Sequence, residues 1–256
     1  MSSVRNAVKE FVRSVFGSFD VPILSGINRG RRWRIKSGVT SCWFGTYEQH
    51  ESSLLAALIP AGGTVFDVGS HVGYYTLAAS RIVGPRGQIV AFEPDPQNLF
   101  YLRHHLASNR IANVTVIDRP VGDKHDQVVS FVANTEFSYE SGVRDAGEAG
   151  GADMRLVSLD QVSAERGVSP DVVKMDIEGF EGAALAGARS VMAERKAAWL
   201  ISLHGLDQAF DCIGLLRDAG YDVYDVKNGK LLTAVLEFPI YSILGLPKGR
   251  SFPKLA

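Results

Sequence analysis

Apolar and polar residues follow the two periods of regular secondary structure along most of this chain. Between residues 48 and about 225, segments with helical apolar spacing alternate with short continuous apolar runs that are typical of buried strands. The expected helices cover residues 48–59, 74–83, 96–109, 181–194 and 207–220, and the expected strands cover residues 64–69, 88–94, 114–122, 171–179 and 197–205. Strands that alternate with helices of this length indicate βαβ units and a mainly parallel sheet, an α/β fold.

Two regions depart from this alternation. Residues 221–232 predict a β-hairpin with Asn228-Gly229 at its turn, so we expect an antiparallel pair at the C-terminal side of the sheet. Apolar runs at residues 128–133 and 154–160 flank a stretch rich in Gly, Ala and Glu over residues 137–153. That stretch indicates a surface loop, either a lid over a site or a simple insertion.

The first 47 residues have a different pattern. Residues 3–19 predict an amphipathic helix, which can lie on a membrane surface, but its few charges of mixed sign favour packing against its own domain. Residues 29–36 carry five basic side chains on an alternating, strand-like segment, which suits either an anionic ligand or a solvated edge strand. We therefore divide the chain into an N-terminal helix and basic β extension, residues 1–47, and a main α/β domain, residues 48–256.

Composition narrows the class of protein. Hydrophobic residues make up 46% of the 256 positions and charged residues 21%, as in a folded globular protein. A net charge of −1 gives no global attraction to nucleic acid, and we expect no nucleic-acid partner. Only Cys42 and Cys212 are present, no apolar run is long enough to cross a bilayer, and charges interrupt the N-terminal apolar residues. The expected location is the cytoplasm.

The segment "VFDVGSHVGYYT" carries the first chemical signal. Its strand ends at Asp67, and Gly69 and Gly73 follow with Ser70 and His71 between them. Dinucleotide-binding loops have the pattern GxGxxG, with two glycines two residues apart, whereas here they are four apart. An aspartate at this place repels a pyrophosphate but suits a ligand with an ammonium or sulfonium charge.

The end of the next strand points to the same ligand. In "VAFEPDP", Glu93 lies about twenty residues after the glycine loop, where a carboxylate can accept hydrogen bonds from both hydroxyls of a ribose. Pro94 adds a rigid apolar face for an adenine ring. Together these residues describe a nucleoside site beside an amino-acid pocket, and S-adenosylmethionine matches both.

Further motifs carry a family resemblance. The segments "VFDVGSHVGYYT", "AFEPDP", "VSLDQV", "DVVKMDIEGFEG" and "LISLHG" occur in this order, and the chain from Gly45 to Pro247 resembles FkbM-type methyltransferases. The resemblance implies a class I, Rossmann-like fold: a seven-stranded, mainly parallel sheet with helices on both faces and a C-terminal antiparallel hairpin. It also implies an S-adenosylmethionine-dependent transferase, in most cases an O-methyltransferase acting on sugars, glycans or other small natural products.

The resemblance assigns roles by position. Asp67, Gly69 and Gly73 match the loop at the methionine end of the donor, and Glu93 matches the ribose carboxylate. Asp118 and Asp123 follow the third strand, where one of them would contact the adenine, although both could simply cap loops.

Two departures from the family pattern stand out. Ser70-His71 replaces the more usual Ala-Asn, so His71 is expected to hydrogen-bond within the cofactor loop and not to act as a base. Ser202 occupies the place of a fifth-strand carboxylate, and we therefore expect no metal site at Asp176 and His204.

The acceptor chemistry is expected at the fourth and fifth strands. Methyl transfer needs an aligned acceptor and, for a hydroxyl, a base. Lys174, Asp176 and Glu178 alternate onto one side of the fourth strand exit, and His204 ends the next strand. Our hypothesis makes Asp176 or His204 the base, with Lys174 keeping Asp176 ionised or orienting the acceptor. A Lys–Asp pair that only stabilises the strand end is the alternative for Lys174 and Asp176.

Two other functions were weighed. A methyltransferase-like module without catalysis is compatible with the departure at Ser202. An NAD-dependent oxidoreductase is disfavoured by the missing GxGxxG pattern.

Overall fold

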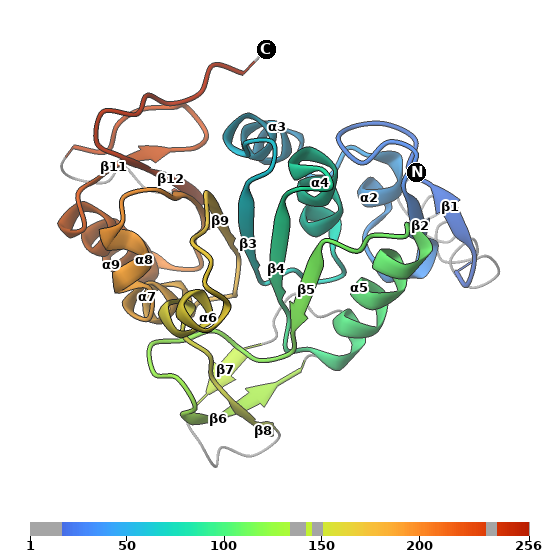
Figure 1. The fold of residues 1–256 in the computed structure, drawn as a ribbon, viewed down its shortest axis with the longest axis horizontal. Coiled ribbons are helices and arrows are strands. Elements are labelled where there is room, and N and C mark those ends of the chain that lie inside the picture. The colour runs from blue at the N-terminus through green and yellow to red at the C-terminus, as the bar shows by residue number, and fades with distance from the viewer. Residues whose placement is uncertain (1–16, 134–141, 145–150, 234–239, 256) are drawn as a thin grey trace, which may run out of the picture.

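A seven-stranded sheet forms the centre of the computed structural model, which describes residues 17–133, 142–144, 151–233 and 240–255 (Figure 1). Its strands lie in the order β11-β12-β10-β9-β3-β4-β5. They are β3 (Thr64–Val68), β4 (Gln88–Phe92), β5 (Val114–Ile117), β9 (Val172–Met175), β10 (Ala198–Ser202), β11 (Tyr221–Asp225) and β12 (Ser242–Pro247). Neighbours from β10 to β5 are parallel, and β12 is antiparallel to both β10 and β11. The predicted α/β fold, with its mainly parallel sheet and antiparallel C-terminal pair, is confirmed.

Helices cover both faces of this sheet (Figure 1). One layer contains α3 (Gln49–Leu58), α4 (Tyr74–Val83) and α5 (Pro96–Ser108), and the other contains α6 (Leu159–Arg166), α7 (Glu181–Ala186), α8 (Arg189–Ala193) and α9 (Leu206–Asp218). Because side chains alternate across a strand, Val65 of β3 packs in the core on the side of α3 and α4, whereas Phe66 and Val68 pack in the core on the side of α6 to α9. Both faces of the central strands are thus buried, which explains their continuous apolar runs.

The predicted helix over residues 181–194 is interrupted. Its two halves, α7 and α8, are separated at Gly187-Ala188. A Cβ on Gly187 would lie 2.2 Å from the carbonyl oxygen of Gly122, so the chain approaches a neighbouring loop there more closely than any other residue would allow. Tertiary packing therefore overrides the helical pattern at this point.

The C-terminal antiparallel pair forms in a different way from the expected local hairpin. The chain does turn at Asn228-Gly229, where the N–H of Asp225 donates to the carbonyl of Lys230, and Tyr224 makes an isolated bridge with Leu231. The strand partner of β11, however, is β12, which comes later in the chain and inserts between β11 and β10.

A second, smaller sheet lies at the lower end of the central sheet in Figure 1. It has the order β7-β6-β8, formed by β6 (Val128–Val132), β7 (Gly142–Arg144) and β8 (Ala152–Arg155). The predicted loop over residues 137–153 is therefore partly strand, and its segments 137–141 and 145–150 lie outside the described residues, as does its possible role as a lid.

The segment before α3 packs against the main domain. Strands β1 (Asp20–Pro22) and β2 (Arg32–Arg34) pair antiparallel, followed by a short 3-10 helix (Ile35–Ser37) and α2 (Thr40–Phe44). Trp33 is fully buried and stacks on His105 of α5, with ring centroids 4.1 Å apart. Most of the predicted helix over residues 3–19 lies outside the described residues.

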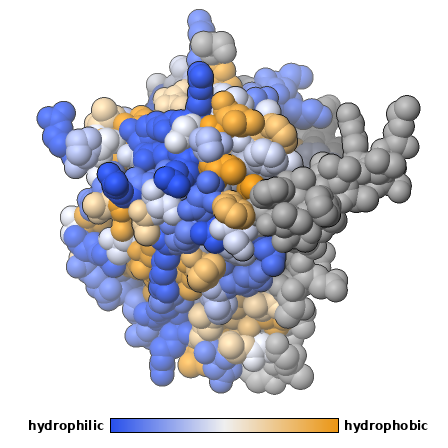
Figure 2. Space-filling view, turned by 90° about the vertical axis from the view of Figure 1, so that its right-hand side faces the viewer, coloured by the Kyte–Doolittle hydropathy of each residue, from blue (hydrophilic) through white to orange (hydrophobic). Residues whose placement is uncertain are grey.

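The surface over this segment is mixed in character. Figure 2 shows the side of the molecule that carries α5 and the N-terminal strands, where small apolar groups are interspersed among hydrophilic residues. Among the helices in the described ranges, none combines the length and the apolar character that a membrane crossing requires.

Candidate functional site

The topology of the sheet creates a crevice beside β3. The chain leaves β3 toward β4 and β5 on one side, whereas β9 and β10 extend the sheet on the other side. Ligands of open α/β sheets bind beyond the carboxyl ends of the strands at such a reversal. An open pocket lies there and encloses roughly 1090 Å³ of empty space, its mouth included. Residues after β3, β4, β5 and β9 line it, together with residues from the segment before α3.

The loop after β3 is held close to the exit of β9. Gly69 has a left-handed φ of 77°, and a Cβ on it would lie 1.9 Å from the carbonyl oxygen of Asp176. The hydroxyl of Ser70 donates to the carbonyls of Phe92 and Asp67, at 3.0 and 3.1 Å. Gly73 then caps α4, also with a left-handed φ. These contacts turn the loop so that Gly69, Ser70 and His71 line the pocket.

Glu93 follows β4, and the loop after β3 helps to hold its carboxylate in place. Its Oε2 accepts the backbone N–H of His71 at 2.7 Å, and its Oε1 accepts the N–H of Asp95 at 2.9 Å and the side-chain amide of Asn98 at 3.3 Å. Glu93 is only 5% exposed, yet it lines the pocket beside Pro94. Burial raises the pKa of Glu93 to about 7, although the three hydrogen bonds oppose this shift. The carboxyl thus changes charge near neutral pH.

A buried ion cluster lies under the centre of the pocket. Lys174 of β9 is in register with Asp67 of β3, and its Nζ lies 3.4 Å from Oδ2 of Asp176 and 4.9 Å from the ring centroid of Tyr75. Burial opposes the charge on Lys174, but the carboxylates of Asp176 and Asp67 outweigh it and raise the pKa of the lysine. Burial raises the pKa of Asp67, and Thr76 donates a hydrogen bond to its Oδ2. The lysine is therefore a fixed positive charge that faces Asp176.

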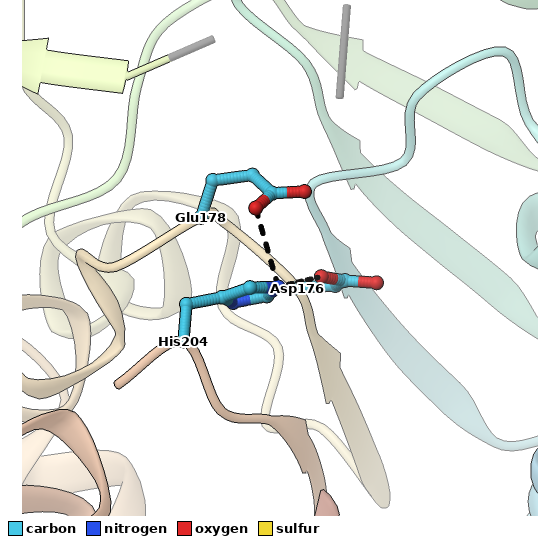
Figure 3. Close-up of side chains that lie close together, drawn as sticks. All are labelled: Asp176, Glu178 and His204. Carbon is cyan, nitrogen blue, oxygen red and sulfur yellow. Dashed lines mark ion pairs between the residues drawn. The ribbon is translucent and has the colours of Figure 1, made fainter. Parts of the chain in front are cut away.

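His204, after β10, lies beside Asp176 and Glu178, which are part of the pocket lining (Figure 3). Its Nε2 lies 3.6 Å from Oδ1 of Asp176 and 3.3 Å from Oε2 of Glu178. Its Nδ1 lies 2.9 Å from Oε1 of Glu181, a fully buried carboxylate. The hydrogen bond to Glu181 raises the pKa of His204, against the effect of burial. For Glu178, in contrast, burial is the main cause of a raised pKa.

The structure brings most of the predicted site residues together but not all of them. Gly69, Ser70, His71, Glu93, Pro94, Lys174 and Asp176 line the pocket, and His204 touches its edge through Asp176. Asp67 and Gly73 lie behind the lining. Asp118 and Asp123 are exposed and do not line the pocket, where Arg119, Pro120 and Val121 are found instead.

The basic residues 29–36 also fall outside the pocket lining. Arg34 pairs with Asp20 at 2.7 Å, and this pair holds β1 and β2 to His104 of α5. The segment acts as packing between the N-terminal strands and α5, which agrees with the edge-strand interpretation and not with an anion site.

Sequence reasoning missed two parts of the site. Tyr47 and Tyr75 form a pocket wall beside Glu48, whose carboxylate accepts the hydroxyl of Tyr75. Nothing in the local sequence relates Glu48 to a helix that begins at Tyr74. Glu181 is the second residue that the sequence analysis did not include. It is the third acidic residue of the segment "DIEGFE", after Asp176 and Glu178, and this clustering of carboxylates could have indicated it.

Comparisons with known proteins relate the chain to methyltransferases. A family profile described as the methyltransferase FkbM domain matches residues 67–223, which is more than half of the chain. No curated protein matches.

Solved structures of similar fold include a methyltransferase FkbM from Methylobacillus flagellatus KT, at 20% identity and a TM-score of 0.48, over 72% of this chain and 43% of that one. A precorrin-6y C5,15-methyltransferase from Geobacter metallireducens GS-15 matches at 19% identity and a TM-score of 0.46, over 78% of this chain and 90% of that one. The chain thus covers less than half the length of the Methylobacillus protein.

Removal of the buried ammonium tests the ion cluster. We expect Lys174→Met to lower the free energy of unfolding by about 2–4 kcal/mol at pH 8, because Asp67 and Asp176 lose their shared counter-charge. The loss should be smaller at pH 5, because burial raises the pKa of Asp67 and protonation of this carboxyl relieves its uncompensated charge. Urea unfolding at both pH values measures this.

The control is Lys196→Met, which removes an exposed lysine paired with Asp171 at 3.1 Å. It should cost less than about 1 kcal/mol. Equal losses for the two variants would show that the ammonium of Lys174 does not stabilise the fold by compensating the buried carboxylates.

Proposed function

Because the chain belongs to the FkbM family of S-adenosylmethionine-dependent methyltransferases, we propose that it methylates a hydroxyl group of a sugar, glycan or other small natural-product acceptor, in the cytoplasm. One observation carries the proposal. A single pocket has a nucleoside-type carboxylate, Glu93, on one side and the cluster of Lys174 and Asp176, with His204 at its mouth, on the other. A donor and an acceptor can therefore meet between them.

The donor half consists of the β3 loop and the end of β4. S-adenosylmethionine, when bound, supplies a methyl group on a positively charged sulfur, which an acceptor oxygen displaces in line. In this assignment Glu93 accepts hydrogen bonds from the ribose hydroxyls, and Pro94 packs against the adenine. Gly69, Ser70 and His71 face the methionine end. The N–H of His71 already anchors Glu93, so His71 stays a member of the cofactor cradle.

Asp67 does not line the pocket, so in this assignment it supports the donor loop without contacting the donor. Its carboxyl is 1% exposed, and its Oδ1 is a buried oxygen without a hydrogen-bond partner in the described ranges. It lies behind the loop, where it stabilises the loop through its hydrogen bond with Thr76 and its position beside Lys174. For the adenine, Asp118 and Asp123 stay candidates from the family resemblance, while Arg119 to Val121 already line the pocket.

The acceptor half consists of the exits of β9 and β10. The acceptor hydroxyl must lose its proton as its oxygen attacks, and Asp176 and His204 are the groups that we assign to take it. The ammonium of Lys174 is buried and lies 3.4 Å from Asp176, so it stabilises this carboxylate and fixes its position. Either Asp176 or His204 therefore serves as the base, and Lys174 positions Asp176.

The pKa of Glu93 predicts how donor binding depends on pH. Ribose hydroxyls donate to the ionised carboxylate, but below about pH 7 the free protein holds a proton on Glu93. Binding must then release this proton, so the affinity for S-adenosylhomocysteine should rise by up to about tenfold per pH unit below pH 7 and level off above it. Calorimetry at pH 5.5 to 8.5, in buffers of different ionisation enthalpy, measures both the affinity and the proton.

The variant Glu93→Gln should bind about 10- to 100-fold more weakly above pH 7 and lose this pH dependence, since an amide does not titrate. Glu165→Gln, which removes an exposed carboxylate on α6, should behave like the wild type. An unchanged pH profile in Glu93→Gln would contradict the ribose assignment.

Turnover tests the acceptor half. With S-adenosylmethionine labelled in its methyl group and fractionated host glycans and metabolites as acceptors, the wild type should transfer label. Asp176→Asn or His204→Gln should reduce kcat by about 10²- to 10⁴-fold, the usual contribution of a general base, while S-adenosylhomocysteine binding stays within about twofold.

Asp207→Asn is the matched control, because it removes an exposed carboxylate three residues after His204. Full turnover in both Asp176→Asn and His204→Gln would exclude them as bases. Donor binding without transfer to any acceptor would instead favour a non-catalytic module.

A further inference from the structure

Three side chains from two strand exits converge at the mouth of the pocket. Asp176 and Glu178 follow β9, His204 follows β10, and Figure 3 shows both carboxylates directed at the imidazole. One ligand atom from each of the three lies within 4.8 Å of the others. The Nε2 of His204 is 3.3 Å from Glu178 and 3.6 Å from Asp176. In octahedral sites with bonds near 2.1 Å, neighbouring ligands are about 3 Å apart and opposite ones about 4 Å, so the two distances from Nε2 of His204 suit a shared cation.

A buried carboxylate, Glu181, orients the ring of His204 for binding a cation. Oε1 of Glu181 lies 2.9 Å from Nδ1, and a carboxylate accepts hydrogen bonds, so Nδ1–H is the donor of this bond and Nε2 is the nitrogen that faces Asp176 and Glu178. Histidines that bind metals almost always donate their other ring N–H to a carboxylate or carbonyl in this way. Glu181 is 0% exposed, which locks the orientation of the ring.

The same carboxylate supplies a second, independent observation. Oε2 of Glu181 is buried and has no hydrogen-bond partner among the residues that the structure describes. A buried anion with an unsatisfied oxygen is costly unless positive charge lies close by. The carboxylates of Asp176, Glu178 and Glu181 gather around one imidazole, with the Lys174 ammonium as the neighbouring lysine. A cation bound among them would add positive charge to this group of carboxylates.

Glu178 supplies the ligand that the fifth strand lacks. Ser202 ends β10 in place of a carboxylate, which was the reason to expect no metal from the sequence. Glu178 and Gly179 both adopt left-handed φ values, 51° and 97°, and Oε1 of Glu181 accepts the N–H groups of Ile177 and Gly179. Glu181 thus organises both the turn that carries Glu178 and the ring of His204.

We propose that Asp176, Glu178 and His204 bind one divalent cation, with Glu181 as the residue that positions them. Carboxylate and imidazole ligands without a thiolate favour Mn²⁺ or a cation of similar chemistry. All three side chains are partly exposed, at 23%, 35% and 32%, so coordination positions stay open to water or to acceptor oxygens. This inference rests on the proposed function in one respect: the cation would hold the acceptor in the methyl-transfer pocket, and Asp176 and His204 would then both be ligands and not free bases.

Manganese binding to the full chain tests the site. After removal of metals with EDTA, titration with Mn²⁺ alone, followed by the EPR signal of the free aqueous ion, should show one saturable site per chain. Glu178→Gln, Asp176→Asn and His204→Gln should each weaken binding at least tenfold, and Glu181→Gln by about tenfold or more. Electron spin echo modulation from a coordinated ¹⁴N should be present in the wild type and lost in His204→Gln.

Asp207→Asn is again the control and should bind Mn²⁺ like the wild type, since it changes local charge without removing a ligand. Binding of S-adenosylhomocysteine, measured separately, should be unchanged in Glu178→Gln, which also shows that this variant folds. Absence of a saturable site in the wild type, or an equal loss in Asp207→Asn and Glu178→Gln, overturns the cation site. Failure of the proposed function has a different signature, a wild type that binds no S-adenosylhomocysteine.

Discussion

The architecture of the site depends on the buried ammonium of Lys174. It lies between Asp67 on β3 and Asp176 after β9, and so it joins the two strands between which the sheet reverses its order. Two carboxylates side by side at these strand ends would repel each other without it. The close approach of Gly69 to the backbone of Asp176 requires the same two strand ends to stay together. The loop after β3 and the exit of β9 are consequently fixed relative to each other by the charge of Lys174 and by the absence of a side chain at Gly69.

The sequence predicted the parts of the fold that depend on local patterns. The buried strands β3, β4, β9 and β10 were evident as short apolar runs, since both of their faces are covered by helices. Local patterns do not encode which strands pair over long distances. The insertion of β12 between β10 and β11 is such a case, because the Asn228-Gly229 turn is a genuine hairpin signal, yet the sheet partner of β11 comes later.

The candidate site was predictable to a similar degree and for a similar reason. Strand ends in a parallel sheet meet at one edge, so Glu93, Lys174, Asp176 and His204 could be grouped from their positions alone. Tyr47 and Glu48 could not, because only tertiary packing brings the segment before α3 to Tyr75. Conversely, Asp118 and Asp123 have the expected positions in sequence, but their side chains are exposed and outside the pocket lining.

The most direct measurement of the central claim is the stabilisation of the wild-type chain by candidate ligands of the pocket. S-adenosylhomocysteine at about 100 times its dissociation constant should add about 2.7 kcal/mol to the free energy of unfolding, and NAD at the same concentration should add nothing measurable. This result is predicted because the loop from Gly69 to Gly73 lacks the glycine spacing for a pyrophosphate, while Glu93 faces the same pocket. Stabilisation by NAD without any effect of S-adenosylhomocysteine would contradict the account.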